Sequence, residues 1–177
     1  MEKKTEYLSG VERSMRADDI LVSKTDLKGH ITYANRAFID ISGYDERELI
    51  GAPHNLVRHP HMPRCVFSLL WERIQLGEEI FAYVVNRSKN GDHYWVLAHV
   101  TPSRDESGAV IGYHSSRRCP DTWVVTETIV PLYDSLLREE RKHEKRKDSI
   151  KSGIDMIMSL LKQKGASYDE LIFSLQA

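Results

Sequence analysis

The chain has 177 residues, of which 41% are hydrophobic and 29% are charged. This composition is typical of a soluble globular protein with one domain and a smaller appendage, and it excludes extended disorder. The 25 basic and 26 acidic side chains nearly balance, so no overall electrostatic field attracts nucleic acid or an anionic membrane.

The chain carries no apolar run of the roughly 20 residues that a membrane-spanning helix requires. Its charged N-terminus is not followed by the apolar core of a secretory signal, so we expect a cytoplasmic protein. Cys65 and Cys119 lie far apart and lack the spacing of a metal or redox pair.

Residues 1–18 are interpreted as a polar lead-in that forms a short amphipathic helix. Its apolar side chains recur at helical spacing, at Tyr7, Leu8, Val11 and Met15. Two β-rich runs follow, residues 19–24 and 30–34, on either side of a turn that ends in Gly29. These runs predict a β-hairpin.

Three short helices are predicted next. Asn35 is a suitable N-cap for a helix over residues 36–43. A second helix over residues 45–50 begins with a capping box, because Glu48 follows its first residue by three positions. After a loop, residues 63–75 carry apolar side chains at helical spacing and predict the third helix.

From residue 80 onward the apolar side chains alternate, which predicts three antiparallel strands. The strands cover residues 80–87, 94–101 and 110–116. The turn Lys89-Asn90-Gly91-Asp92 between the first two is a strong hairpin signal. Together with the first hairpin, these strands predict an α+β fold in which a five-stranded antiparallel sheet carries short helices on one face.

Residues 120–177 are predicted to form a helical extension. The charged run 138–148 is interpreted as the solvated face of a helix. Beyond it, an amphipathic helix carries an apolar stripe at Ile150, Ile154, Ile157, Met158 and Leu161. A final helix over residues 167–175 begins with another capping box. The stripe could pack on its own domain, on a second copy or on a partner helix, and homodimerisation is our leading hypothesis.

The loop before the third helix is rich in polar groups. Arg58 and His59 are held by Pro60 and Pro63, which restrict the backbone, so the loop offers fixed donors to an anionic ligand. With His54, His61 and Cys65 the loop also forms a loose set of metal-donor groups. Their spacing fits no familiar zinc site, so no metal is expected.

Several segments in this order match one family. They are Thr25-Asp-Leu, Ile31-Thr-x-Ala-Asn35, Ser42-Gly-Tyr, Pro53-His-Asn, Val57-Arg-His-Pro, Met62-Pro, Lys89-Asn-Gly-Asp-His-Tyr-Trp-Val96 and Gly112-Tyr. Residues 19–118 therefore resemble a PAS domain, and in particular the flavin-binding PAS domain of bacterial aerotaxis receptors. We expect a PAS sensor domain at residues 19–119, between the lead-in and the C-terminal extension.

The resemblance implies a sensor that binds FAD non-covalently and reports redox or oxygen state to a chemoreceptor or kinase. Residues associated with the flavin in this family correspond to Asn35, His54, Arg58, His59, Asn86 and Arg117. We add Trp95, whose ring could flank an aromatic cofactor, as could that of Trp71. The alternative is a ligand-free or haem-binding module that acts as an adaptor or dimerisation domain.

Simpler interpretations stand beside these. Asn35 could serve as a helix cap alone, Trp71 as a core residue, and Ser115-Ser116 as the polar edge of a strand. The family pattern has an acid where this chain has His61, and Trp-x-Gly where it has Ile80-Phe81-Ala82. The sequence has no glycine-rich phosphate loop or nucleophile elbow, so no catalytic residue and no enzymatic activity are expected.

Overall fold

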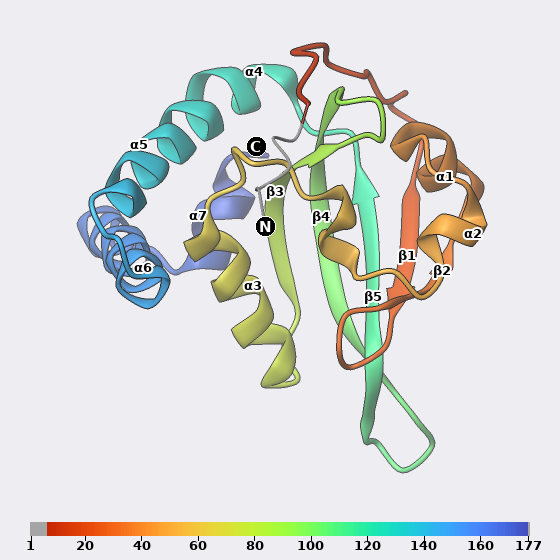
Figure 1. Ribbon diagram of the computed structural model, residues 1–177. Coiled ribbons are helices and arrows are strands. Elements are labelled where there is room, and N and C mark those ends of the chain that lie inside the picture. Colours follow the sequence, from red (N-terminus) through yellow and green to blue (C-terminus); the bar gives the residue numbers. More distant parts are fainter. Residues whose placement is uncertain (1–6, 177) are drawn as a thin grey trace.

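The computed structural model describes residues 7–176 and contains a five-stranded sheet in the order β2-β1-β5-β4-β3 (Figure 1). All neighbouring strands are antiparallel. The strands are β1 (Leu21–Thr25), β2 (Ile31–Ala34), β3 (Ile80–Arg87), β4 (His93–Arg104) and β5 (Val110–Arg118). The predicted α+β fold is confirmed, with β5 at the centre of the sheet.

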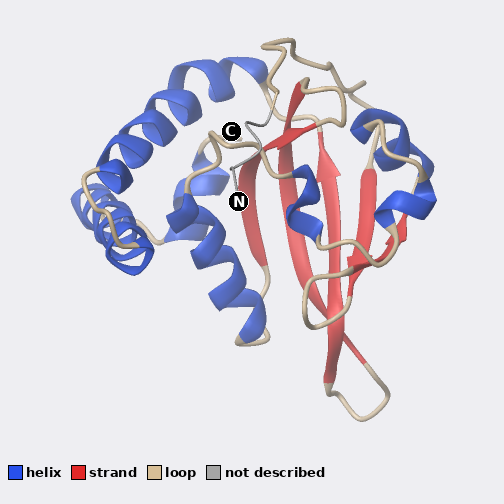
Figure 2. Cartoon of the chain, viewed as in Figure 1, coloured by secondary structure: helices blue, strands red, loops and turns tan. Residues whose placement is uncertain are grey.

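Helices flank the sheet at both ends (Figure 2). Before β3 in the chain come α1 (Arg36–Ser42) and α2 (Glu46–Leu49), which contact β1 and β2, and the 3-10 turn η1 (His54–Val57). Helix α3 (Arg64–Gln75) follows and contacts β3, β4 and α6. The C-terminal group is α4 (Thr122–Val124), the π-helical segment η2 (Val125–Ile129), α5 (Val130–Arg141), α6 (Arg146–Lys164) and α7 (Tyr168–Ser174). Within residues 7–176, no helix combines the length and hydrophobicity needed to cross a bilayer.

The predicted helix caps are present. Asn35 accepts a hydrogen bond of 3.1 Å from the Phe38 N–H, and α1 ends at Gly43 in the left-handed conformation with φ 69°. At the start of α2, the Asp45 N–H donates to Glu48 at 2.9 Å. These local signals were readable from the sequence because each cap lies within three or four residues of its helix.

The predicted N-terminal helix is wrong for the described residues. Residues 7–18 contain no helix, and residues 1–6 lie outside the described part. The backbone N–H of Arg13 donates to the His93 carbonyl at 2.7 Å, and its side chain pairs with Asp92 at 2.9 Å. The β3–β4 hairpin thus takes up the backbone groups of this segment, and tertiary pairing outweighs a weak helical pattern.

One face of the sheet forms the core with α1 and α3, and the opposite face is partly covered by the C-terminal helices, since Tyr83 and Val85 of β3 are buried there. On β4, Tyr94, Val96 and Ala98 are buried in the core, while Trp95 and Leu97 between them belong to the opposite face. The core-facing side of the sheet packs against α1 and α3. Because side chains alternate along regular strands, the face of each residue in β3, β4 and β5 follows from its position, except at the register shift between Ser103 and Arg104.

The C-terminal helices pack on their own domain. Helix α6 lies against α3 and α5, and α7 lies against β3. Ile157 and Leu161 of the predicted stripe are buried in this packing, whereas Met158 is exposed. The Tyr133 hydroxyl of α5 donates to the Tyr83 carbonyl of β3. Part of the predicted stripe therefore packs on its own chain, and contact of the remainder with a second copy or a partner helix stays a prediction.

The charged run 138–148 is more structured than predicted. Helix α5 ends at Arg141 and α6 begins at Arg146, so the run bends between two helices. Glu139 pairs with Lys142 at 2.6 Å, as expected for exposed neighbours. Glu140, however, is only 4% exposed. A fully solvated face is therefore the wrong description of this segment.

Gly153 lets α6 approach α3 closely. A methyl group at this position would lie 2.7 Å from Cys65 Sγ, which is well inside van der Waals contact. We expect Gly153→Ala to lower the free energy of unfolding by about 1 kcal/mol, because the overlap outweighs the helix propensity gained. Urea unfolding measures this. Ser159→Ala, on the exposed side of α6, is the control, and a stabilised Gly153→Ala protein would contradict the close packing.

Candidate ligand-binding site

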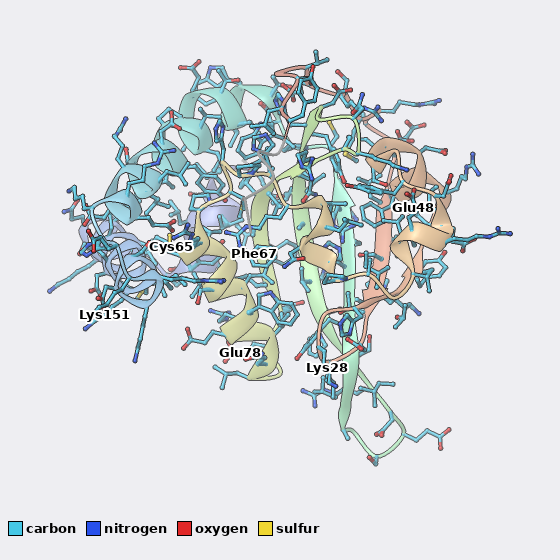
Figure 3. All side chains as sticks on the ribbon, viewed as in Figure 1. Lys28, Glu48, Cys65, Phe67, Glu78 and Lys151 are labelled. Carbon is cyan, nitrogen blue, oxygen red and sulfur yellow. The ribbon has the colours of Figure 1, made fainter. Side chains whose placement is uncertain are left out.

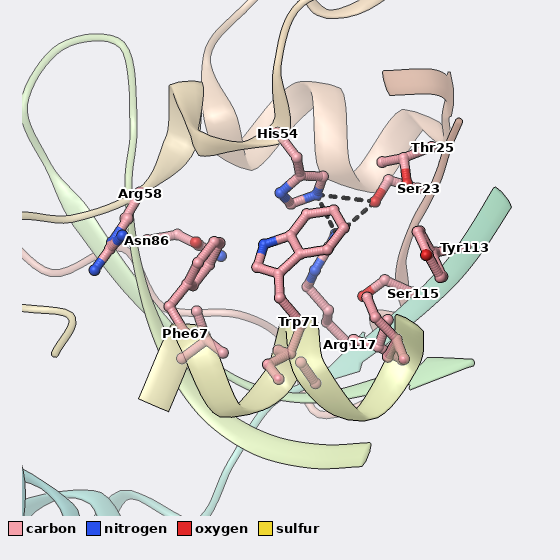
Figure 4. Close-up of a pocket in the computed structure, with 15 residues that line it drawn as sticks. Ser23, Thr25, His54, Arg58, Phe67, Trp71, Asn86, Tyr113, Ser115 and Arg117 are labelled. Carbon is pink, nitrogen blue, oxygen red and sulfur yellow. Dashed lines mark hydrogen bonds between the residues drawn. The ribbon is translucent and has the colours of Figure 1, made fainter. Parts of the chain in front are cut away.

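A cavity of about 70 Å³ lies between α3 and the core-facing side of the sheet (Figure 4). This volume holds several water molecules. It is lined by Ser23, Thr25, His54, Arg58, Phe67, Leu70, Trp71, Ile74, Val84, Asn86, Ala98, Val100, Tyr113, Ser115 and Arg117. Apolar and aromatic walls with a few polar groups are typical of sites for aromatic ligands.

Arg117 of β5 is the central polar group. Its side chain is 3% exposed, its guanidinium lies 4.8 Å from the centre of the Phe38 ring, and one of its nitrogens, Nη2, donates to Ser23. The same nitrogen lies 2.7 Å from His54 Nε2. Burial lowers the pKa of Arg117 to about 10, so the residue remains a cation at neutral pH.

His54 accepts this hydrogen bond. Burial lowers the pKa of His54 to about 3, and the charge of Arg117 acts in the same direction. The imidazole is therefore neutral at physiological pH, with Nε2 as the acceptor and the proton on Nδ1. Ser23 Oγ lies 3.1 Å from the same Nε2, which completes a triangle of three side chains (Figure 4).

Two buried donors in this cavity are unpaired. Within the described part of the chain, Arg117 Nη1 and Asn86 Nδ2 have no hydrogen-bond partner, and Asn86 is 4% exposed. An unpaired buried donor costs about 1–3 kcal/mol. Both residues line the cavity. The site is therefore suited to a ligand that presents hydrogen-bond acceptors to these two nitrogens.

The charge of the cavity favours an electron-rich ligand. Among the described residues that line it there are two arginines and no Asp or Glu. Arg58 stands between the cavity and an open groove on the surface, since it lines both. Its guanidinium lies over the Phe67 ring at 4.6 Å and donates to the Met62 carbonyl at 3.0 Å. A ligand with an aromatic part and an anionic part suits this arrangement.

Four of the seven predicted site residues line this cavity: His54, Arg58, Asn86 and Arg117. They come from η1, the loop after it, β3 and β5, so only the folded chain brings them together.

The other three predicted residues lie elsewhere. The side-chain oxygen of Asn35 accepts from the N–H groups of Val22 and Phe38, and its nitrogen donates to the Ile20 carbonyl, so its amide is used by the backbone. His59 lines two neighbouring hollows. Trp95 lies on the outward side of β4, 5.9 Å from the Tyr133 ring.

Ser115 and Ser23 are among the polar residues of the cavity that sequence reasoning missed. Ser115 was assigned to a polar edge, but β5 is the central strand and Ser115 is buried. Its alternation with Tyr113 and Arg117 was the available signal. Ser23 carried no sequence signal, because its role depends on Arg117, which lies 94 residues later. Trp71 lines the cavity, edge-on to Tyr113 at 5.6 Å between ring centres.

Comparison with known proteins agrees with this geometry. Residues 31–117 match the family model described as PAS fold. The chain is also 43% identical over 131 residues to the aerotaxis receptor of Escherichia coli K12. The aligned region covers 73% of this chain and 25% of the receptor. The chain belongs to the PAS domain family. A second relative is a nitrogen fixation regulatory protein of Klebsiella pneumoniae, 26% identical over 56% of this chain and 20% of that protein.

Solved structures show the same fold. The light-state dimer of the fungal blue-light photoreceptor Vivid has a TM-score of 0.51 at 23% identity, covering 60% of this PAS protein and 82% of that chain. The dark structure of the photoreceptor Aureochrome1 LOV has a TM-score of 0.53 at 19% identity, and the match covers 67% of this chain and 83% of that chain. The chain spans a quarter or less of the length of the two curated relatives described above.

Proposed function

We propose that this PAS protein is a non-enzymatic sensor that binds FAD non-covalently and reports the redox state of the flavin. The observation that carries the proposal is the pair of unpaired buried donors, Arg117 Nη1 and Asn86 Nδ2, in a cavity that has cations and no acid among its described lining residues. The pyrimidine edge of a flavin offers carbonyl and ring-nitrogen acceptors, which suit these donors. Similarity to an aerotaxis receptor supports the same conclusion.

Each polar residue has a part in this function. Arg117 and Asn86 would hold the pyrimidine edge, and Phe67 and Trp71 would form the apolar walls. Arg58, at the mouth, would bind the anionic phosphates as they leave the cavity. The bound flavin supplies reversible uptake of electrons. A fixed buried cation such as Arg117 stabilises added negative charge and therefore raises the electron affinity of whatever it contacts.

The redox change would be transmitted from the site to the helices through changes in side-chain packing. A change in the hydrogen bonding at Asn86 and Arg117 alters how β3 and β5 meet α3, and the helices that pack on α3 respond. A second copy of the chain or a chemoreceptor or kinase helix is the proposed receiver. This part of the proposal rests on the family and on the helical extension.

The test is the visible spectrum of the purified chain, before and after reconstitution with FAD, FMN or riboflavin. We expect an oxidised-flavin spectrum that bleaches with dithionite, and FAD as the tightest of the three ligands. A Soret band would replace the proposal with haem binding. A colourless protein that takes up none of the three flavins would leave the role of an adaptor.

A further inference from the structure

Helix α3 does not supply its own N-terminal cap. The residue at its N-cap is Pro63, which makes no side-chain cap hydrogen bond. Instead the Cys65 N–H donates at 2.8 Å to the carboxylate of Glu140, 75 residues further along the chain. A carboxylate at this end of a helix is also favoured by the helix dipole. The C-terminal extension therefore fixes the first turn of the helix that forms one wall of the cavity.

Glu140 also acts on the mouth of the cavity. It lines the open surface groove together with Arg58. Burial lowers the pKa of Arg58, and the charge of Glu140 opposes this change, so the two groups attract each other. A ligand phosphate that approaches Arg58 must compete with this carboxylate.

The opposite faces of α3 meet different partners. Phe67 and Trp71 face the cavity. Cys65 lies on the side that faces the C-terminal helices (Figure 3). Gly153 of α6 packs directly against it. A methyl group at Gly153 would lie 3.5 Å from Glu140 as well. Helix α3 is thus held between the ligand site and the contact formed by Glu140, Cys65 and Gly153.

The cavity is tight for the proposed ligand. Its volume of about 70 Å³ holds several waters, and a substituted three-ring system needs more room. The sheet on one side is continuously hydrogen-bonded, whereas α3 on the other side is held by side chains. The wall that moves outward is therefore α3, and outward movement presses on α5 and α6.

We propose that Glu140 is a positioning residue that acts as a latch between α3 and α5 in the unliganded chain, so that filling the cavity, which presses α3 outward, loosens α5 and α6. The identity of the ligand rests on the function proposed above. The coupling is reciprocal: whatever loosens the latch raises the affinity of the cavity. In such a switch, ligand binding in the cavity would expose the surface that α5 and α6 cover in the unliganded chain.

The test compares Glu140→Gln with wild type in the full chain. Glutamine keeps an oxygen for the Cys65 N–H and removes the charge. We expect FAD to bind about fivefold or more tightly to the variant, within the usual range of allosteric coupling. We also expect amide exchange in α5 and α6 to be faster in the variant without ligand, and FAD to cause the same acceleration in wild type. Mere structural damage would weaken FAD binding instead.

Two further variants sharpen the result. Glu139→Gln is the matched control, since Glu139 bonds Lys142 and Ser152 without an interaction with α3 among the described contacts. It should leave FAD affinity unchanged. Gly153→Ala fills the space behind α3 on the α6 side, so it hinders outward movement of α3 and should lower FAD affinity. This second variant keeps the test valid if Glu140→Gln does not fold.

The outcomes are distinct. Equal or weaker FAD binding by Glu140→Gln, or tighter binding by Gly153→Ala, would overturn the latch. Amide exchange in wild-type α5 and α6 that does not change with FAD would also overturn it. If wild type binds no flavin, the proposed function fails while the latch is still decided by exchange in the unliganded proteins. In that case, amide exchange in α5 and α6 of unliganded Glu140→Gln at the wild-type rate would refute the latch.

Discussion

Arg117→Met is expected to weaken FAD binding about tenfold to a hundredfold, the loss typical of a hydrogen bond from a charged donor. The same variant should unfold, without ligand, at nearly the urea concentration of wild type. Most substitutions of a fully buried, hydrogen-bonded residue destabilise a protein. The expectation is different here because the charge of Arg117 has no acidic partner among the described residues of the cavity.

The stability estimate follows from the charge. Burial lowers the pKa of Arg117 from the ordinary value of an arginine to about 10. The folded state therefore carries a penalty of about 3 kcal/mol at neutral pH relative to a solvated arginine. Methionine removes this penalty and fills similar space. It leaves Ser23 and His54 without their donor, at a cost of about 1–3 kcal/mol. The two effects offset each other.

Arg118→Met is the matched control, because the next residue of β5 is exposed and points to the opposite face. It should change neither FAD affinity nor stability beyond about 0.5 kcal/mol. Fluorescence titration and urea unfolding supply the two measurements. Wild-type FAD affinity in Arg117→Met would remove Arg117 from the binding site, and a large loss of stability would show that the cation is structural.

His54→Gln is expected to make the unliganded protein less sensitive to acid. The folded-state pKa of His54, about 3, lies below the unfolded value near 6.5. As the pH falls from 6.5 toward 3, the unfolded chain takes up a proton at this residue that the folded chain refuses. Wild-type stability therefore decreases by about 1.4 kcal/mol per pH unit in this window, or about 2 kcal/mol by pH 5.

The measurement is the free energy of unfolding from urea titrations at pH 5.0 and 6.5. Glutamine can still accept from Arg117, so the variant should fold, and the difference between the two curves isolates His54. This difference matters because burial also lowers the pKa of His59, to about 4, and adds a similar slope in both proteins. A variant with the wild-type pH profile would mean that His54 is protonated or exposed in the folded state.

Local signals predicted most of the fold. The caps at Asn35 and Glu48 and the turn around Gly91 depend on neighbours in the sequence, and the structure contains them. The N-terminal segment could not be read in this way. Its conformation is set by bonds to Asp92 and His93, about 80 residues away, and a spacing pattern carries no information about such partners.

The part of the site that carries family motifs or follows from strand alternation could be predicted from the sequence. Of the six residues to which the resemblance pointed, His54, Arg58, Asn86 and Arg117 line the cavity, and Asn35 and His59 do not. Alternation along β4 alone is enough to place Trp95 on the outer face, opposite Val96. Glu140 is different, since a carboxylate within a run of charges gives no sign that it caps a helix packed against it.

The position of β1 bears on how this domain can be dissected. The family match begins at residue 31, yet β1 (Leu21–Thr25) lies between β2 and β5. A fragment trimmed to residues 31–117 would lose an interior strand, leave a gap in the middle of the ladder and remove Ser23, which anchors Arg117. Borders drawn from family alignments are thus unsafe for expression here, and a minimal fragment must start before Leu21.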